Sequence, residues 1–201
     1  MCLLVESIKV EKRKLWNMEF HNLRFNSSRR DLFNIKDDLL LENILNISSD
    51  IGGGIYKCRV LYDEKINKIE WKKYRRKEIK YLKVVRCDNI DYSYKYSNRN
   101  VFNMLLKENK CSENQDILIV KNGRVTDTSC SNIALFNGKE WHTPLLPLLK
   151  GTKREELLQN GILIEKDILL EELQHYKFVK PINAMIEFEN YGSIPVHNII
   201  L

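Results

Sequence analysis

The sequence predicts an α+β protein built in two parts, and three observations lead to this fold class. Stretches of alternating apolar and polar residues, typical of strands, occur together with stretches whose apolar residues recur at helical spacing. The 201 residues, 43% of them hydrophobic and 30% charged, suffice for a core and are not a disordered composition. A polar, tyrosine-rich segment divides an N-terminal α+β half from a C-terminal α/β half. We expect a small N-terminal domain over residues 1–88, a linker over 89–97 and a C-terminal domain over 98–201.

In the N-terminal half, alternation and helical periodicity predict six elements. They are a strand over 3–10, helices over 19–33 and 37–45, and strands over 55–62, 69–74 and 79–86. Gly52–Gly54 lacks the Gly-Lys-Ser/Thr of a phosphate loop and precedes a strand, so a plain turn is expected there. The basic block Lys72–Lys80 is interpreted as a charged hairpin edge. The alternative is that Arg75 or Arg76 binds a substrate carboxylate at a pocket rim.

The C-terminal half is predicted to begin with a helix over 98–107 and a hairpin within 117–136. Asn122-Gly123 suits the type I′ turn of that hairpin, because both residues tolerate positive φ. Gly161 suits the C-terminal cap of a helix that ends at Gln159. The remaining expected elements are a strand over 140–142, a helix over 152–159, a strand over 162–164, a helix over 169–175, a strand over 178–185 and a short apolar tail.

A run of seven small polar residues, Thr126–Asn132, lies between the apolar strands of the hairpin region. A buried polar group needs a hydrogen-bond partner, so such a run is costly to place in a core. The run is therefore either an ordinary surface loop or the wall of a polar pocket.

Charge and cysteine content narrow the classes of function. The net charge of +6 and the pI near 9.0 permit an anionic small ligand or nucleic acid. No zinc-ligand pair, aromatic RNA-binding motif or recognition-helix pattern supports the nucleic-acid alternative. Five widely spaced cysteines, an odd number, argue against a disulfide framework and against a metal site. We see neither a signal peptide nor a membrane span, and expect a cytoplasmic protein.

Four features together could hold a cofactor. Lys95 lies between two tyrosines and could be a nucleophilic amine in a partly dry cleft, although a surface lysine is the alternative. Asp127 is the only acid of the polar run, and Arg24 lies in an otherwise apolar helix segment. At residues 150–154, backbone N–H groups and a hydroxyl come together at a helix start, where an anion can bind. A reactive lysine, an isolated carboxylate and a phosphate-ready helix start are the parts needed to hold pyridoxal 5′-phosphate (PLP).

Six stretches follow one another across residues 5 to 186: VESIKV, HNLRF, YKYSNR, KNGRVTDTSCSNIALF, HTPLLPLLKGTKREELL and PINAMI. Together they resemble motifs of the class IV aminotransferase family. This is the D-amino-acid and branched-chain aminotransferase fold that includes 4-amino-4-deoxychorismate lyase. The resemblance implies a two-domain PLP fold of fold type IV, here with a shortened N-terminal domain.

The resemblance also implies roles for individual residues. Lys95 is expected to hold PLP as a Schiff base and to be the catalytic residue. Arg24 is expected to contact the cofactor phosphate, and Asp127 to keep the pyridine nitrogen protonated. Asn183 is expected on the substrate side, as in the lyase members. The other expected cofactor-binding residues are Ser131, Asn132, Gly151 and Thr152.

The chain departs from the family pattern in three ways. Asp127 stands where the family usually has Glu, which keeps the charge and is one methylene shorter. The sequence Gly151-Thr152-Lys153-Arg154 moves the expected hydroxyl by one position. Backbone N–H groups are therefore expected to donate more of the hydrogen bonds to the phosphate. The leading hairpin and part of the small domain are not recognisable, which bears on substrate specificity more than on the cofactor.

The predicted function is a PLP-dependent enzyme that transfers an amino group from an amino-acid-like substrate to a 2-oxo acid. The freed Lys95 amine would abstract the substrate α-proton. The same residues would serve a 4-amino-4-deoxychorismate lyase, which releases pyruvate and 4-aminobenzoate. Alternatives of another class are a cofactor-free binding protein that keeps the fold and a basic nucleic-acid-binding module. Because the family is typically homodimeric, we expect a homodimer, with neither a nucleic-acid nor a membrane partner.

Overall fold

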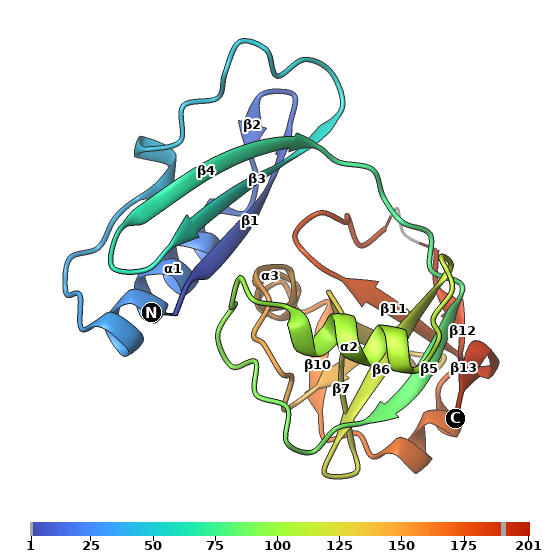
Figure 1. Ribbon diagram of the computed structural model, residues 1–201. Helices are drawn as coiled ribbons and strands as arrows, with labels where there is room; N and C mark the ends of the chain where they lie inside the picture. Colours follow the sequence, from blue (N-terminus) through green and yellow to red (C-terminus); the bar gives the residue numbers. More distant parts are fainter. Residues whose placement is uncertain (1, 190–191) are drawn as a thin grey trace. The chain divides into compact units, whose positions relative to one another are not determined.

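The computed structural model describes residues 2–189 and 192–201. The chain folds into two compact units (Figure 1). Unit 1 comprises the residues up to Arg76 together with Tyr94–Asn98, and unit 2 comprises Lys77–Ser93 and Arg99–Leu201. Mixed sheets with few helices confirm the predicted α+β class. The proposed domain limits at residues 88 and 97 stay a prediction.

Unit 1 is an antiparallel sheet with one long helix, α1 (Met18–Phe33), on one face (Figure 1). The strand order is β2-β1-β3-β4. Along β3 the buried side chains alternate with less buried ones, and they pack in one apolar cluster with Phe25 of α1. The strands are β1 (Leu4–Glu11), β2 (Lys14–Leu15), β3 (Ile55–Tyr62) and β4 (Ile66–Lys73).

The predicted helix over residues 37–45 is wrong. This segment is extended apart from one 3-10 turn, Leu41–Asn43. Two asparagines of α1 bind its backbone instead. Asn26 exchanges hydrogen bonds with the N–H and C=O of Leu39 at 3.1 and 2.9 Å, and Asn22 accepts the Leu41 N–H at 3.0 Å. These long-range bonds satisfy backbone groups that a local helix would otherwise have paired.

The basic block begins at the edge of this sheet. Lys72 and Lys73 end β4, which is an edge strand, and both are exposed. This agrees with the interpretation of a charged hairpin edge. Arg75 and Arg76 lie just beyond the strand and are exposed as well. The strand itself begins at Ile66, three residues earlier than predicted.

Unit 2 contains two sheets that share a core. One has the order β13-β5-β6-β7 and the other β10-β9-β8-β11-β12. Buried apolar residues of both sheets form a single cluster that includes Leu118, Val125, Ile133 and Val179. The strands are β5 (Tyr81–Arg86), β6 (Gln115–Lys121), β7 (Arg124–Thr128), β8 (Asn132–Phe136), β9 (Trp141–Pro144), β10 (Leu163–Lys166), β11 (Phe178–Ile182), β12 (Ile194–Pro195) and β13 (Ile199–Ile200).

Two α-helices and two 3-10 helices complete the described part of unit 2. The helix α3 has the predicted bounds, Thr152–Gln159, and Gly161 follows it with a φ of +68°. The predicted helix over 169–175 is a 3-10 helix, and the strand predicted to reach residue 185 ends at Ile182. Asn183 stops that strand because its side chain accepts the Met185 N–H at 2.9 Å, which forms a local turn. The other helices are α2 (Asn100–Glu108), η2 (Leu170–His175) and η3 (Val196–Asn198).

The β6–β7 hairpin turns as predicted and contains an irregularity that matters for the site. Asn122 and Gly123 have φ values of 50° and 76°, as a type I′ turn requires. The register then shifts, since Val120 pairs with Val125 but Leu118 pairs with Thr128. One extra residue of β7 therefore falls between these pairs, where Thr126 and Asp127 lie. Such bulges re-aim side chains near functional sites.

No helix in residues 2–189 and 192–201 combines the length and the apolar character that a membrane crossing requires.

The turn glycine provides the first test. Gly123→Ala should lower the free energy of unfolding by about 1–2 kcal/mol, because the left-handed conformation is unfavourable for a residue with a Cβ. Gly53→Ala is the matched control, since a Cβ there meets nothing within 4 Å and φ is not positive. Denaturant unfolding of both variants measures the difference. Equal stabilities would contradict the turn assignment.

Candidate active site

In unit 1, a buried carboxylate joins β1 to α1. Glu6 is fully buried, and its two oxygens receive three hydrogen bonds. Arg24 donates from Nε to Oε1 at 2.8 Å and from Nη2 to Oε2 at 2.5 Å. The His21 Nδ1 lies 2.6 Å from Oε2. His21 and Arg24 are three positions apart in α1, so they share the helix face that meets the strand.

These contacts determine the charge of each group. Burial by itself raises the pKa of Glu6, but the charge of Arg24 and the hydrogen bonds from His21 and Arg24 outweigh it and lower the pKa to about 2. Burial lowers the pKa of His21, and the charges of Arg24 and Lys95 lower it further against the opposing effect of Glu6. At neutral pH the cluster therefore holds an ionised carboxylate, a guanidinium and a neutral imidazole.

The predicted catalytic lysine is attached to the same strand. The Lys95 carbonyl accepts the Val5 N–H at 2.9 Å, and the Ser97 N–H bonds the carbonyl of Leu3 at 2.8 Å. The backbone of Lys95 is thus fixed next to Glu6, and its side chain is half-buried. Unit 1 brings together two of the predicted site residues, Arg24 and Lys95, around the start of β1.

In unit 2, Asp127 leaves the bulged part of β7 and is 5% exposed. Asn132 donates to Oδ1 at 2.8 Å, and the Leu149 N–H donates to Oδ2 at 3.1 Å. Burial raises the pKa of Asp127 to about 7, although these hydrogen bonds and the charge of Arg154 oppose the rise. Within the described residues, Asp127 forms no ion pair. A buried carboxylate in this state favours a cationic N–H donor.

Asn132 links Asp127 to the start of α3. Its Nδ2 donates to the Leu149 carbonyl at 2.7 Å as well as to Asp127. A Cβ on Gly151 would lie 2.0 Å from the Asn132 Oδ1, so only glycine fits at this position. Thr152 follows as the first residue of α3 and is 2% exposed. Asn132 therefore orients Asp127 and packs against the helix start.

The rest of the polar run is also buried. All of its members except Cys130 are at most 8% exposed, so it is not an ordinary surface loop. Ser131 bonds Thr128 through the backbone, and its hydroxyl accepts the Asn183 Nδ2 at 2.8 Å. The polar groups of the run thus bond one another, Asn183 and neighbouring segments of unit 2. Unit 2 therefore contains five of the predicted cofactor-binding residues close together, with Asn183 bonded to one of them. The five are Asp127, Ser131, Asn132, Gly151 and Thr152.

Three residues of these clusters, Glu6, His21 and Arg99, were not predicted as site residues. Two predicted residues, Arg75 and Arg76, lie apart from the contacts around Glu6. Glu6 carried a signal, since it is an acid on the apolar face of an alternating strand. Arg99 closes the YKYSNR stretch, and its Nη2 donates to the Ser129 carbonyl. Arg75 and Arg76 are exposed and take no part in the Glu6 cluster.

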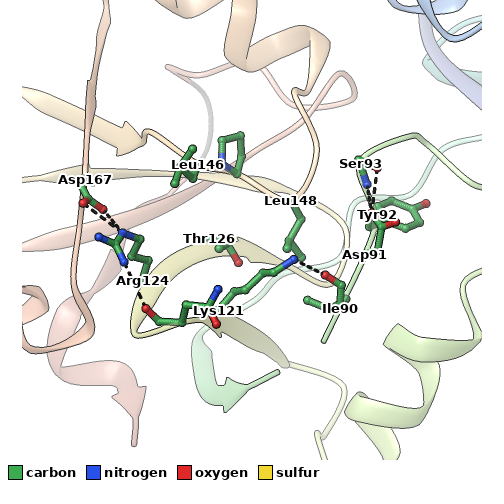
Figure 2. A pocket seen from close by; sticks show the side chains of 12 residues that line it. Ile90, Asp91, Tyr92, Ser93, Lys121, Arg124, Thr126, Leu146, Leu148 and Asp167 are labelled. Atoms are coloured by element: carbon green, nitrogen blue, oxygen red, sulfur yellow. Dashed lines mark hydrogen bonds and ion pairs between the residues drawn. The ribbon is translucent and has the colours of Figure 1, made fainter. Parts of the chain in front are cut away.

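A pocket of about 420 Å³ in unit 2 is separate from these clusters (Figure 2). Thr126 lines it, whereas Asp127 and the other predicted site residues do not. Its basic groups already bind protein atoms, as the dashed lines in Figure 2 show. Lys121 donates to the Ile90 carbonyl at 2.7 Å, and Arg124 pairs with Asp167 at 2.8 Å. This pocket is therefore not the candidate active site.

Comparison with known proteins identifies the family to which the chain belongs. The model of the family described as Amino-transferase class IV matches residues 59–194. An uncharacterized protein of Haemophilus influenzae is 35% identical over 185 residues, which cover 90% of this chain and 97% of that protein. A candidate aminodeoxychorismate lyase of Schizosaccharomyces pombe is 36% identical over 78 residues, 36% of this chain and 34% of that protein.

A similar crystal structure is that of a candidate 4-amino-4-deoxychorismate lyase from Haemophilus somnus 129pt. It superposes with a TM-score of 0.82 at 32% identity, over 92% of this chain and 97% of that chain. The PLP-bound form of a hypothetical aminotransferase from Mycobacterium tuberculosis shares the fold, with a TM-score of 0.77 at 13% identity over 98% of this chain and 81% of that chain.

The fold is therefore that of the fold type IV PLP enzymes. The chain belongs to the class IV aminotransferase family. This confirms the resemblance seen in the sequence, and with it a PLP-dependent enzyme that acts on a small amino substrate.

The packing of Gly151 against Asn132 is testable by a double-mutant cycle. Gly151→Ala should cost about 1–3 kcal/mol of unfolding free energy, because the new Cβ overlaps the Asn132 amide. In an Asn132→Ala background the same change should cost much less, since the three heavy atoms nearest to that Cβ all belong to the Asn132 side chain. Additive effects in denaturant unfolding would show that the contact does not exist.

The raised pKa of Asp127 predicts a pH dependence of stability. Because the folded pKa exceeds the ordinary value of 3.8, the contribution of this group is fully present below pH 3.8 and is lost as the pH rises through about 7. Asparagine does not titrate, so Asp127→Asn should not show this loss. As the pH rises from 3.8 to about 7, the unfolding free energy of the variant should increase relative to that of wild type by up to about 4 kcal/mol.

The measurement is the difference in unfolding free energy between wild type and Asp127→Asn, followed from acidic to neutral pH without cofactor. Asp63→Asn is the control. The pKa of Asp63 is lowered instead of raised, mainly by a hydrogen bond from the Asn67 side chain. A difference between wild type and Asp127→Asn that does not change with pH would refute the raised pKa.

Proposed function

We propose that this protein binds PLP covalently through Lys95 and uses it to remove the α-proton of an amino-acid-like substrate. The observation that carries the proposal is the buried Asp127 carboxylate, which only neutral N–H donors hold and whose pKa is about 7. Such a group is the expected partner of a protonated pyridine nitrogen, because none of the hydrogen bonds that the described residues make to this carboxylate comes from a cationic side chain.

The residues present fit this cofactor. Lys95 is half-buried on a backbone that β1 fixes, as a lysine with a covalent role requires. Arg24 offers a guanidinium of fixed orientation for a phosphate, and the Gly151–Thr152 start of α3 offers backbone N–H groups. In this proposal Asn132 orients Asp127, and Ser131 and Asn183 line the neighbouring wall.

Bound PLP supplies an electron sink for the negative charge that develops when the α-proton leaves. The chain's own residues do the rest. The Lys95 amine accepts the α-proton at Nζ and returns it, as a general base and then a general acid. Asp127 holds the proton on the pyridine nitrogen, and its burial excludes water that would weaken this interaction.

Two reactions are compatible with these roles. Amino transfer to a 2-oxo acid follows from the family as a whole. Release of pyruvate and 4-aminobenzoate, the lyase reaction, is favoured by a specific observation. The Haemophilus somnus structure, at 32% identity and with 97% of its chain covered, carries the lyase description, whereas the aminotransferase structures that we compared are at most 19% identical.

We also propose that the protein acts as a homodimer. The support is the typical assembly of the family. Light scattering of the purified protein gives the mass in solution.

The covalent role of Lys95 is tested by absorbance. Wild-type protein with PLP should show the near-visible band of a lysine-bound cofactor, and Lys95→Ala should abolish it. Lys83→Ala is the matched control, because Lys83 is also half-buried and its Nζ bonds the Asn109 carbonyl in unit 2. A wild-type protein without the band would support the cofactor-free alternative. Salt-sensitive RNA or DNA binding without the band would support the nucleic-acid module.

Product analysis separates the two reactions. The enzyme is incubated with aminodeoxychorismate, and pyruvate and 4-aminobenzoate are measured; amino transfer to 2-oxoglutarate is assayed in parallel. Equimolar release of both products establishes the lyase. Amino transfer without their release removes it.

A further inference from the structure

Glu6 contacts Arg24 in a way that orients the guanidinium. The carboxylate meets one edge of the planar group, through Nε at 2.8 Å and Nη2 at 2.5 Å. Because the five N–H donors of a guanidinium are coplanar, a side-on pair fixes the plane and leaves the opposite edge directed away from the carboxylate. The direction in which Nη1 points is therefore set by Glu6.

Glu6 itself has little freedom to move. It is completely buried, lies on a central strand of the sheet, and receives the third hydrogen bond from His21 at 2.6 Å. Arg24 is 14% exposed and is connected to the backbone by a long flexible side chain. In this pair the carboxylate is consequently the fixed partner and the guanidinium the oriented one.

The net charge of the cluster gives a second argument. The ionised carboxylate of Glu6 offsets the charge of Arg24, and burial keeps His21 neutral. A phosphate that binds Arg24 would thus gain little from net charge and would depend on N–H groups aimed at it. Glu6 would therefore help phosphate binding by orienting the Arg24 guanidinium, although its negative charge lowers the net positive charge of the cluster.

The same strand positions the lysine. The Val5 N–H, one residue before Glu6, bonds the Lys95 carbonyl at 2.9 Å. Residues 5 and 6 of β1 therefore hold the lysine through its backbone and the arginine through its side chain, all within unit 1. The two residues that would bind the cofactor, Lys95 and Arg24, are thus both held in place by the dipeptide Val5-Glu6.

We propose that Glu6 is a positioning residue for cofactor binding, which holds the Arg24 guanidinium in the orientation that receives the PLP phosphate. This inference rests on the proposed function, in which Arg24 takes the phosphate. It differs from two other roles for the same contact. Glu6 could act only as a counter-ion that weakens phosphate binding, or only as a structural ion pair.

The test compares PLP with pyridoxal, which can react with the same lysine but has no phosphate. Dissociation constants for both are measured by absorbance titration. Glu6→Gln should weaken PLP binding by about tenfold or more, the effect of losing charge-assisted hydrogen bonds, and leave pyridoxal binding unchanged. Arg24→Gln should produce the same selective loss, and the double variant should lose no more than Arg24→Gln alone.

Glu70→Gln is the matched control. Glu70 lies in β4 of the same unit and pairs with Arg59 at 2.7 Å and Lys68 at 2.9 Å, outside the Glu6 cluster. Its ratio of PLP to pyridoxal affinity should equal that of wild type. Glu6→Asp is included because it retains the buried charge if Glu6→Gln does not fold. Its carboxylate is one methylene shorter, so a selective but smaller loss of PLP affinity is expected.

The outcomes separate the roles. Tighter PLP binding by Glu6→Gln would identify a counter-ion, and equal losses for PLP and pyridoxal would identify a structural pair; either overturns the inference. An unchanged ratio in Glu6→Asp overturns it too. If only the Arg24 variant loses the preference for PLP, the proposed function stands and the role of Glu6 does not. If wild type forms no adduct with PLP, both fail.

Discussion

The burial of an ionised carboxylate is the constraint on which unit 1 depends. An isolated buried charge costs far more than one ion pair contributes, so Glu6 requires its partners in place. Those partners are His21 and Arg24 on one face of α1, which fixes how the helix lies along β1. Removing one partner would leave an uncompensated charge in the core, whereas the intact cluster has a carboxyl pKa of about 2.

Unit 2 contains a buried acid of the opposite kind. Asp127 has N–H donors instead of a guanidinium, and its pKa is about 7. Two carboxyl groups of one chain are thus held in different protonation states by their surroundings. Such a separation is typical of enzymes that assign different tasks to similar groups. Glu6, which is paired with Arg24, has a structural and positioning role. Asp127, which is bonded by neutral N–H groups, is suited to a ligand that carries a positive charge.

The sequence was informative where the signals are local. The bounds of β3 and α3 and the Asn122-Gly123 turn follow from alternation, periodicity and turn chemistry within a few residues. The false helix over 37–45 shows the limit of this approach. Its apolar periodicity is real, but asparagines of α1 that lie thirteen to nineteen residues earlier bind its backbone. Local propensity is then overridden by tertiary contacts.

The site shows the same division. Family motifs indicated Lys95, Arg24 and Asp127, but the bulge in β7 and the contact between Asn132 and Gly151 depend on strand register and on segments that meet only in the fold. Asn132 donates a hydrogen bond to Asp127 in the structure, and its predicted role in cofactor binding stays a prediction. Glu6 could have been recognised as an acid on an apolar strand face, yet its partners could not be identified without the helix beside it.

The most direct test of the account is to locate the covalent attachment of the cofactor. Wild-type protein is incubated with PLP, reduced with borohydride, digested and analysed by mass spectrometry. The reduced cofactor should be found on the peptide that contains Lys95 and on no other lysine at comparable occupancy. A modification spread over exposed lysines, or confined to a different lysine, would contradict it.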